Sequence, residues 1–301
     1  MNDIFFIADP HLGHDTIVLH CKRNKWIIPN PNYNPSKKFH FKYNNPEMAD
    51  IEAHDEALIE YWNKRVSKKG TVYIHGDFAY KDHRKYIQAL NGKKVLIKGN
   101  HDKMSHDCYS LFREFDLNDP SLFFDISKEN KSILKRFKNG DVDIDLCNKN
   151  IISSLWSKFM QLQDFEDIDQ MSSECYNSFQ SVHEMGLRRR IDKQDITLCH
   201  YAMLSWASSI HGSYHTYGHS HGRMPEWDNR LMFDVGVDVW GYAPVPWEVI
   251  VEKMSRKNFK PFGGDGESKP QGTYSFDPDE RVEQTRAKNL DLLKEMGVEI
   301  F

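Results

Sequence analysis

An apolar run that leads straight into polar side chains is the feature that most constrains the fold of this chain. The run KVLI at residues 94–97 is followed within two residues by the stretch GNHD at residues 99–102. A short apolar run bounded by a glycine is typical of a buried strand. We therefore expect an amide, an imidazole and a carboxylate at the end of that strand, where loops carry chemistry.

The same arrangement occurs twice earlier in the chain. The stretch IFFIAD at 4–9 is a short apolar run, and TVYIHGD at 71–77 ends in an aspartate. Helices are expected between the strands, over 46–66, where Pro46 suits a helix start, and over 82–90. The resulting β-α-β-α-β order predicts an α/β sheet with its chemistry at the carboxyl ends of the strands.

The second half of the chain has a different order of expected elements. Its expected strands follow one another with little helix between them, which predicts a second sheet of mixed or mostly antiparallel strands. Residues 15–46, rich in Asn, Pro, Lys and aromatic residues, are expected to form a long surface loop. The later strands are expected over 195–201, 215–222, 230–240 and 246–254.

Changes in composition divide the chain. We expect one domain over 1–255, interrupted by an insertion or cap subdomain over about 116–180, where acidic and amide-rich turns break the strand pattern. Residues 256–301 begin with a linker-like composition and are expected to end in an amphipathic helical tail over 279–297.

Composition limits the class of protein. The chain has 301 residues, a hydrophobic fraction of 39% and a formal net charge of −4, so it can build a core but has no overall basic field. Its five cysteines include no C-x-x-C pair, which argues against a disulfide framework and favours a reducing cytoplasm. We expect no signal peptide and no membrane contact, because no apolar run approaches the roughly 18 residues of a membrane span.

Side chains that bind divalent cations gather at the expected strand ends. They are carboxylates, imidazoles and one amide, without a thiolate, and are typical of sites for Mn, Fe, Ni or Zn. Alternate residues of an extended D-x-H segment point the same way, so Asp9 and His11 can hold one ion. His219 and His221 can do the same or face two adjacent ions. The candidate ligands are Asp9, His11, Asp77, Asn100, His200, His219 and His221.

The ordered set D-x-H, G-D, G-N-H-D, H and G-H-x-H resembles the calcineurin-like metallophosphoesterase family over roughly residues 3–255. It is most similar to small bacterial and phage members with DxHxGH, CHYxM and YGHSHG stretches. The resemblance implies a four-layer α/β/β/α sandwich of two mixed sheets flanked by helices, here with an inserted subdomain. The insertion after GNHD departs from the family pattern and leaves the substrate open.

The resemblance also implies roles for individual residues. One ion would be held by Asp9, His11, Asp77 and His221, and a second by Asp77, Asn100, His200 and His219, with Asp77 bridging. His101 would lie unligated near the phosphoryl oxygens as a general acid or charge stabiliser. Asp102, the second expected catalytic residue, either orients His101 or caps a turn. His14 either contacts the substrate phosphate or makes a loop hydrogen bond, and Tyr201 either stacks on the substrate or packs in the core.

The implied reaction is hydrolysis of a phosphoester, with a phosphodiester as the expected class, by a hydroxide between two metal ions, with Mn as the expected metal. The expected partner is a small phosphorylated substrate or a nucleotide. The alternative is a nuclease acting on DNA or RNA, although the overall acidity of the chain disfavours binding of nucleic acid. A non-catalytic scaffold is a third reading, although such a protein has no reason to keep every ligand. The oligomeric state stays open.

Overall fold

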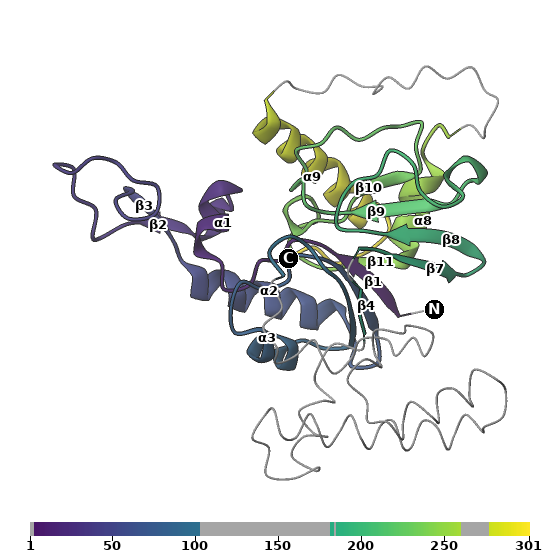
Figure 1. Ribbon diagram of the computed structural model, residues 1–301, viewed down its shortest axis with the longest axis horizontal. Helices are drawn as coiled ribbons and strands as arrows, with labels where there is room; N and C mark the ends of the chain where they lie inside the picture. The colour runs from purple at the N-terminus through teal and green to yellow at the C-terminus, as the bar shows by residue number, and fades with distance from the viewer. Residues whose placement is uncertain (1–2, 103–180, 184, 260–276) are drawn as a thin grey trace, which may run out of the picture. The chain divides into compact units, whose positions relative to one another are not determined.

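The computed structural model describes residues 3–102, 181–183, 185–259 and 277–301 (Figure 1). The chain divides into two units, and the one described here comprises Met1–Met104 together with Phe179–Phe301. The insertion expected over 116–180 lies outside the described residues. The described part is a mixed α/β structure.

Five strands form the first sheet, in the order β11-β1-β4-β5-β6. As the sequence predicts, β1, β4 and β5 are parallel, with Ile4 paired to Thr71 and Thr71 to Lys93 at the start of each register. These strands therefore end at one edge of the sheet. β6 is parallel to β5, and β11 is antiparallel to β1. The bounds are β1 Ile4–Ile7, β4 Thr71–His75, β5 Lys93–Ile97, β6 Ser181–His183 and β11 Val245–Pro246.

Four strands form the second sheet, in the order β10-β9-β8-β7. It is mixed, because β8, β9 and β10 are parallel while β7 is antiparallel to β8. Three of its strands cover segments in which strands were expected from the sequence. The bounds are β7 Leu187–Ile191, β8 Gln194–Leu198, β9 Tyr214–Tyr217 and β10 Met232–Asp234.

The two sheets meet at Ala8. Its N–H donates to Val235 O at 3.1 Å, and its carbonyl accepts from Val237 N–H at 3.0 Å. Side chains from both sheets share one hydrophobic core, and each fully buried residue of this kind contributes about 1.5–3 kcal/mol. The core fixes the strand ends of the two sheets next to each other. Its fully buried members include Phe6, Ile97, Leu198, Phe233 and Ile250.

Helix α2 (Ile51–Arg65) begins later than the sequence predicts. The expected start at Pro46 is wrong, because β3 (Glu47–Ala49) pairs antiparallel with β2 (Ile27–Pro29). The helix begins where Asp50 can cap it, since this side chain accepts from Ala53 N–H at 3.1 Å. Helix α3 (His83–Ala89) follows β4 as expected.

The segment expected as a strand over 246–254 is a helix, α8 (Trp247–Ser255). Trp247, Ile250 and Met254 are buried and recur at spacings of three and four residues, which is the period of a helix and not of a strand. Pro246 stands directly before the first turn, where its missing N–H costs no hydrogen bond. Pro246 is also the last residue of the short strand β11, which ends directly before the helix.

Residues 256–301, expected as a linker and helical tail, contain helix α9 (Pro278–Glu295), close to the expected bounds. Val282, Leu292 and Leu293 of this helix are buried in the main core, so α9 is part of the fold. Among the helices that the structure describes, none combines the length and the apolar character that crossing a membrane requires.

Residues 15–46, expected as a loop, contain α1 (Asp15–His20), the 3-10 helix η1 (Asn24–Trp26) and β2. Strands β2 and β3 form a small sheet of their own and, with their connection, extend to the left of the sheets in Figure 1. We call residues 27–49 the arm. Two further 3-10 helices are η3 (Ser209–His211) and η4 (Val237–Val239).

Candidate metal centre

Loops from both sheets converge beyond the carboxyl ends of the strands and are joined by backbone hydrogen bonds. His11 N–H donates to Asp77 O at 2.9 Å, which ties the loop after β1 to the loop after β4. In the second sheet, Gly218 N–H donates to His200 O at 2.9 Å and ties the loop after β9 to the loop after β8. The candidate ligands are therefore held by backbone contacts before any side chain is considered.

Five of the seven candidate ligands have a left-handed backbone. A positive φ is uncommon in residues other than glycine and costs about 1–3 kcal/mol at each position. Such strain persists only where the surroundings fix it, and it clusters at functional sites. The values of φ are 56° at Asp9, 51° at His11, 50° at Asp77, 64° at His219 and 49° at His221.

Two glycines allow the loops after β4 and β5 to approach each other. A Cβ atom on Gly76, where φ is 81°, would lie 2.5 Å from Gly99 N and 2.6 Å from His200 Nδ1. A Cβ atom on Gly99 would lie against Asp77 Oδ1. Both positions therefore require glycine, because any side chain would keep the two loops apart.

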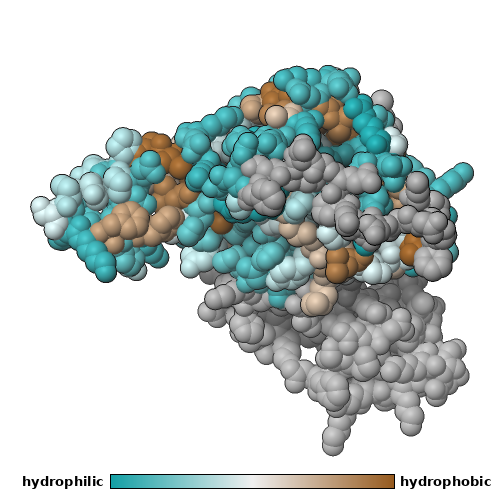
Figure 2. Space-filling model, turned by 90° about the horizontal axis from the view of Figure 1, so that it is seen from above, coloured by the Kyte–Doolittle hydropathy of each residue, from teal (hydrophilic) through white to brown (hydrophobic). Residues whose placement is uncertain are grey.

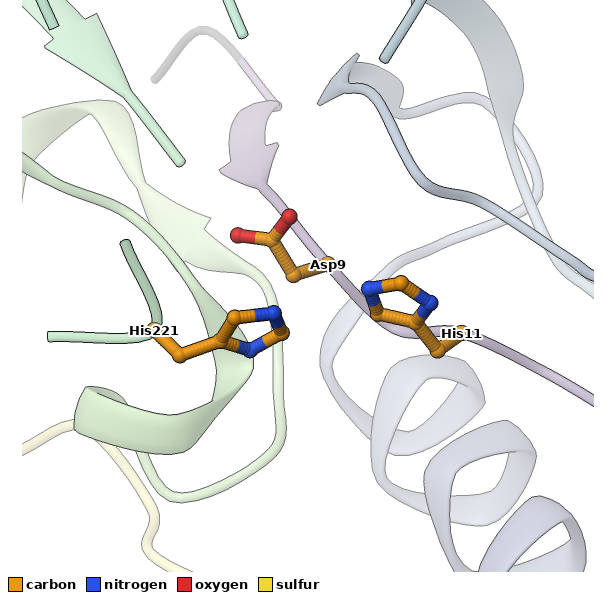
Figure 3. Close-up of side chains that lie close together, drawn as sticks. All are labelled: Asp9, His11 and His221. Atoms are coloured by element: carbon orange, nitrogen blue, oxygen red, sulfur yellow. The ribbon is translucent and has the colours of Figure 1, made fainter. Parts of the chain in front are cut away.

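Asp9, His11 and His221 form the first cluster of possible ligand atoms, each within 4.8 Å of the others. Figure 3 shows Asp9 and His11 on the segment that leaves β1, with His221 across a common space. Asp9 is fully buried, and its Oδ2 accepts from His219 N–H at 2.8 Å. Its Oδ1 has no hydrogen-bond partner among the described residues. A buried carboxylate oxygen without a partner is costly and fits a bound cation.

His14 fixes the orientation of His11. Nδ1 of His11 lies 3.1 Å from Nδ1 of His14, whose Nε2 lies 2.9 Å from Thr16 Oγ1. When His11 Nδ1–H donates to His14 and His14 Nε2–H donates to Thr16, Nε2 of His11 carries no proton and keeps a free lone pair. That buried atom has no hydrogen-bond partner in the described part of the chain and lies 3.4 Å from Asp77 Oδ2. These contacts are the loop hydrogen bonds that the sequence allows for His14, while a contact of His14 with substrate stays a prediction.

Asp9, Asp77 and His200 form the second cluster. Nδ1–H of His200 donates to His75 O at 2.7 Å, which leaves Nε2 as the atom with the lone pair. This Nε2 lies 3.0 Å from Asn100 Oδ1 and 3.7 Å from Asp77 Oδ2. These three acceptor atoms lie close together and repel one another. A cation between them would be coordinated by all three. The nitrogen and oxygen donors suit Mn, Fe, Ni or Zn.

Asp77 lies between the two clusters. Its Oδ2 is 3.4 Å from His11 Nε2 and 3.7 Å from His200 Nε2, and its Oδ1 accepts from His101 N–H at 2.8 Å. The resemblance implies a bridging role for Asp77, and that role stays a prediction. The ring of His219 lies 5.0 Å from the ring of His200, beside the second cluster.

Burial sets the protonation of the ligands. It raises the pKa of Asp9 well above its ordinary value, although the charge of His221 acts in the opposite direction. It lowers the pKa of His200 to about 4 and the pKa of His11 well below its ordinary value. Both imidazoles are therefore neutral near pH 7 and offer the lone pairs that a metal ligand needs. A cation would supply the positive charge that keeps Asp9 ionised.

His221 is oriented by Asp238, whose Oδ2 accepts from its Nδ1–H at 2.7 Å. Burial opposes protonation of His221, but the charges of Asp9 and Asp238 outweigh it and raise the pKa of His221. Burial also opposes ionisation of Asp238, yet Arg23 and His221 hold the pKa of that carboxyl below its usual range. Cys21 Sγ lies within 4.8 Å of atoms of both His221 and Asp238. We assign no ion there, because Asp238 is already paired.

Arg23 is a fully buried part of the site that the sequence pattern did not reveal. Its Nη2–H donates to Asp9 O at 2.9 Å, and its Nη1 lies 2.8 Å from His54 Nε2. His54 is buried as well, and its Nδ1 lies 2.9 Å from Asp55 Oδ1. Arg23 stands between lysines at 22 and 25, and no local signal separates a buried arginine from such neighbours.

Asp102 holds two loops together. Its Oδ2 accepts from Asp77 N–H and Gly99 N–H, both at 2.7 Å, and its Oδ1 accepts from Phe78 N–H at 2.9 Å. Both carboxylate oxygens are therefore directed at the backbone. We correct the catalytic role expected for Asp102 to a positioning role, in which it fixes Asp77 against the loop that carries His101.

The open side of the site carries the remaining predicted residues. Asn100 and His219 are exposed, and His101 is half-buried. Tyr201 is 43% exposed, and its ring lies 4.8 Å from the rings of both His200 and His219. The structure thus brings all the predicted site residues to one place.

Comparisons with known proteins give no activity. No family model matches the chain. It is 30% identical over 108 residues to the uncharacterized protein MJ1445 of Methanocaldococcus jannaschii, covering 34% of this chain and 48% of that protein. It is 38% identical over 71 residues to the gene 66 protein of Mycobacterium phage L5, covering 21% of this chain and 34% of that protein. The chain thus spans about half of the first curated relative and about a third of the second.

A solved structure is also similar. It is the crystal structure of a protein of unknown function from Aquifex aeolicus, with 15% sequence identity and a TM-score of 0.40. The match covers 83% of this chain and 98% of that chain.

Proposed function

We propose that the protein is a metallophosphoesterase of the calcineurin-like type, which hydrolyses a phosphodiester with two divalent metal ions. The observation that carries the proposal is a set of buried acceptor atoms without donors among the described residues. Asp9 Oδ1 and His11 Nε2 have no hydrogen-bond partner, and His200 Nε2 faces Asn100 Oδ1 at 3.0 Å. Bound cations satisfy all of these atoms at once.

The ligand sets proposed for the two ions share one residue. Asp77 would belong to both sets, because its Oδ2 lies between His11 and His200. Mn is the expected metal, and Fe, Ni or Zn fit the same donors. When bound, two such ions acidify a water molecule and polarise a phosphoryl group. The first set is Asp9, His11, Asp77 and His221, and the second is Asp77, Asn100, His200 and His219.

The protein's own residues would position the reaction and move a proton. Asp238 and the carbonyl of His75 hold His221 and His200 with Nε2 free for coordination. His101 is bound to Asp77 through its backbone N–H, and its ring is half-buried at the open side. From there it can stabilise charge on a phosphoryl oxygen or donate a proton to the leaving alkoxide.

The finer architecture is part of the same proposal. We propose a four-layer α/β/β/α sandwich, in which two mixed sheets face each other and helices flank them. The shared core supports it, because β1 and β5 contribute Phe6 and Ile97 while β8 and β10 contribute Leu198 and Phe233. Helix α9 also supports it, since Val282 and Leu293 pack into this core.

Hydrolysis of a generic aryl phosphodiester by the full chain tests the function. We expect turnover with Mn, no turnover with a chelator, and a loss of about 100-fold or more in Asp77→Asn and His101→Ala. The matched controls are Asp291→Asn, whose side chain is 68% exposed, and His211→Ala, at an exposed position. Both controls should hydrolyse the diester at the wild-type rate.

Metal analysis separates this proposal from a non-catalytic scaffold. The proposal requires about two ions per chain after reloading with Mn, and fewer in Asp77→Asn. Less than one ion per wild-type chain would favour the scaffold, and turnover that survives chelation would refute the mechanism. A parallel panel of phosphomonoesters, cyclic diesters and linear diesters decides the substrate class.

A further inference from the structure

Several aromatic side chains of the arm are exposed to solvent. Tyr33, Phe39 and Tyr43 are 37%, 58% and 75% exposed. Figure 2 shows hydrophobic and hydrophilic surface side by side on the arm, at the left of the view. Exposed rings gathered on one projecting segment mark an interaction site more often than scattered single residues do.

The charge of this segment is opposite in sign to that of the whole chain. Residues 27–49 contain three lysines and one glutamate, Glu47, although the formal net charge of the chain is −4. Lys37, Lys38 and Lys42 are exposed, and in the part of the chain that the structure describes none of them is paired with a carboxylate. The general acidity of the protein therefore does not argue against an anionic partner at the arm.

Basic and aromatic residues alternate within the segment KKFHFKY at 37–43. Protein–protein interfaces are depleted in lysine, whereas rings interleaved with lysines suit a chain of stacked bases joined by phosphates. Lys42 Nζ lies 5.8 Å from the centre of the Tyr43 ring, and the His40 ring lies 4.6 Å from it. The ammonium group of Lys42 and the aromatic ring of Tyr43 thus lie next to each other on the surface of the arm.

Asparagine side chains hold the arm in one conformation. Nδ2–H of the buried Asn44 donates to the carbonyls of Asn34, Lys37 and Lys38, each at 3.1 Å. Asn34 N–H donates back to Asn44 Oδ1 at 3.0 Å. Hydrogen bonds from side chain to backbone that replace a regular sheet preorganise the exposed rings, which lowers the entropy cost of binding.

The arm is connected to the metal centre through α1. The ring of His20, the last residue of α1, stacks on the ring of Phe41 with centroids 4.2 Å apart. His14, which orients the ligand His11, directly precedes the first residue of this helix. Six residues of helix span roughly 9 Å, so the base of the arm lies within a few nucleotides of the candidate ligands.

We propose that the arm binds single-stranded nucleic acid, with Tyr33, Phe39 and Tyr43 stacking on bases and the three exposed lysines contacting phosphates. The arm leads the strand toward the metal centre, so the phosphodiester of the proposed reaction belongs to a nucleic-acid strand. Tyr80 supports this path, because it is 57% exposed and its ring stacks on His14 at 4.4 Å. Only this assignment of substrate rests on the proposed function, and binding itself does not.

Binding is measured by fluorescence anisotropy of a labelled 20-nucleotide oligo(dT), and in parallel oligo(rU), with the full chain in excess chelator. Hydrolysis is absent under these conditions, so failure of the metal chemistry leaves the binding test intact. We expect Tyr33→Ala/Phe39→Ala/Tyr43→Ala to weaken binding at least about tenfold, because each stacked base contributes strongly. The matched control is Met185→Ala/Leu204→Ala/Ile210→Ala, at three exposed apolar positions outside the arm, which should bind as the wild type does.

The lysines are tested by salt dependence. Lys37→Gln/Lys38→Gln/Lys42→Gln should reduce the slope of log K against log salt by about 2, since each phosphate contact to a single strand contributes about 0.7. Lys68→Gln/Lys69→Gln/Lys294→Gln, at exposed positions elsewhere, should keep the slope. Circular dichroism of each variant establishes that it is folded.

The proposal is overturned if the wild type does not bind either oligonucleotide, or if the arm variants bind as the controls do. It is also overturned if the chain binds anionic lipid vesicles and no oligonucleotide, because that result makes the arm a membrane contact. Oligonucleotide binding by a chain that fails to hydrolyse any phosphodiester would uphold the arm and refute the proposed function.

Discussion

Arg23 and Asp238 lie 215 positions apart in the chain and form an ion pair with two contacts, Nε to Oδ1 at 2.8 Å and Nη2 to Oδ2 at 2.9 Å. Their side chains are 0% and 1% exposed. The pair matters to the site because the same Oδ2 of Asp238 accepts the Nδ1–H of His221. A buried arginine thus fixes the carboxylate that orients a candidate metal ligand.

Arg23→Met should therefore destabilise the protein strongly. Removing Arg23 takes away both of its contacts with the buried Asp238 and leaves His221 as the remaining partner of that carboxylate, and breaking a buried pair costs about 3–5 kcal/mol in the free energy of unfolding. Denaturant titration of the chelated protein measures it. Arg256→Met is the matched control, because Arg256 is half-exposed in its ion pair with Glu252, and it should change little. Equal effects of the two substitutions would show that the buried pair does not stabilise the fold.

Divalent metal should raise the melting temperature of the chelated wild type. A ligand that binds only the folded state stabilises it by about 2.7 kcal/mol at 100 times its dissociation constant. Thermal unfolding with increasing Mn measures the shift without any assay of activity. Asp77→Asn should abolish most of the shift, whereas Asp291→Asn should keep it, because only Asp77 lies between the two clusters. A shift of equal size in both variants would place the metal elsewhere.

Local sequence patterns were sufficient to predict the strands that carry the ligands. Asp9, Asp77 and Asn100 each follow a short apolar run, and the parallel pairing of β1, β4 and β5 brings the ends of those runs to one edge. The prediction succeeded because strand period and chain order are local properties. The proximity of Asp9 to His200 then follows from the junction of the two sheets at Ala8.

Contacts between distant residues could not be predicted in this way. The partner of Arg23 is 215 positions away, so the residues next to Arg23 in the sequence do not indicate that it is buried. The apolar residues of the α8 segment alternate in part, which is compatible with a strand. The deciding spacing of Trp247, Ile250 and Met254 is recognised only once their burial is known. Asp102 looked catalytic because it follows His101, but its direction toward three backbone N–H groups depends on the loop after β4.

Asp102→Ala should lower stability and activity together. Three N–H groups lose their acceptor, and the two buried ones, of Asp77 and Phe78, each cost about 1–3 kcal/mol when left unpaired. Asp102→Asn keeps one carbonyl oxygen as an acceptor and should lie between Asp102→Ala and the wild type. Denaturant titration and hydrolysis of the aryl diester measure the two effects. Unchanged stability with complete loss of turnover would restore the catalytic role for Asp102.

His215 should make the stability of the fold depend on pH. The ring is fully buried, its Nδ1–H donates to Thr197 O at 3.0 Å, and its Nε2 accepts from Met203 N–H at 3.1 Å. Burial lowers the pKa of His215 from 6.5 to about 4, so the folded state holds the neutral ring and protonation would also break the bond from Met203. Because the folded pKa is depressed, the unfolded chain binds the proton first. The contribution is complete above about pH 6.5 and is lost as the pH falls toward 4.

The change expected from His215 between pH 7.5 and pH 5 is about 2 kcal/mol, since one pKa unit corresponds to about 1.4 kcal/mol. Other groups titrate over the same range, so the quantity to measure is the difference in free energy of unfolding between the chelated wild type and His215→Gln. That difference should shrink by about 2 kcal/mol as the pH falls from 7.5 to 5, because only the wild type loses the contribution of the neutral ring. His211→Gln, at an exposed position, should show a constant difference from the wild type. If the difference for His215→Gln is also constant, the ring is protonated equally in the folded and unfolded states, and its two hydrogen bonds do not hold it neutral.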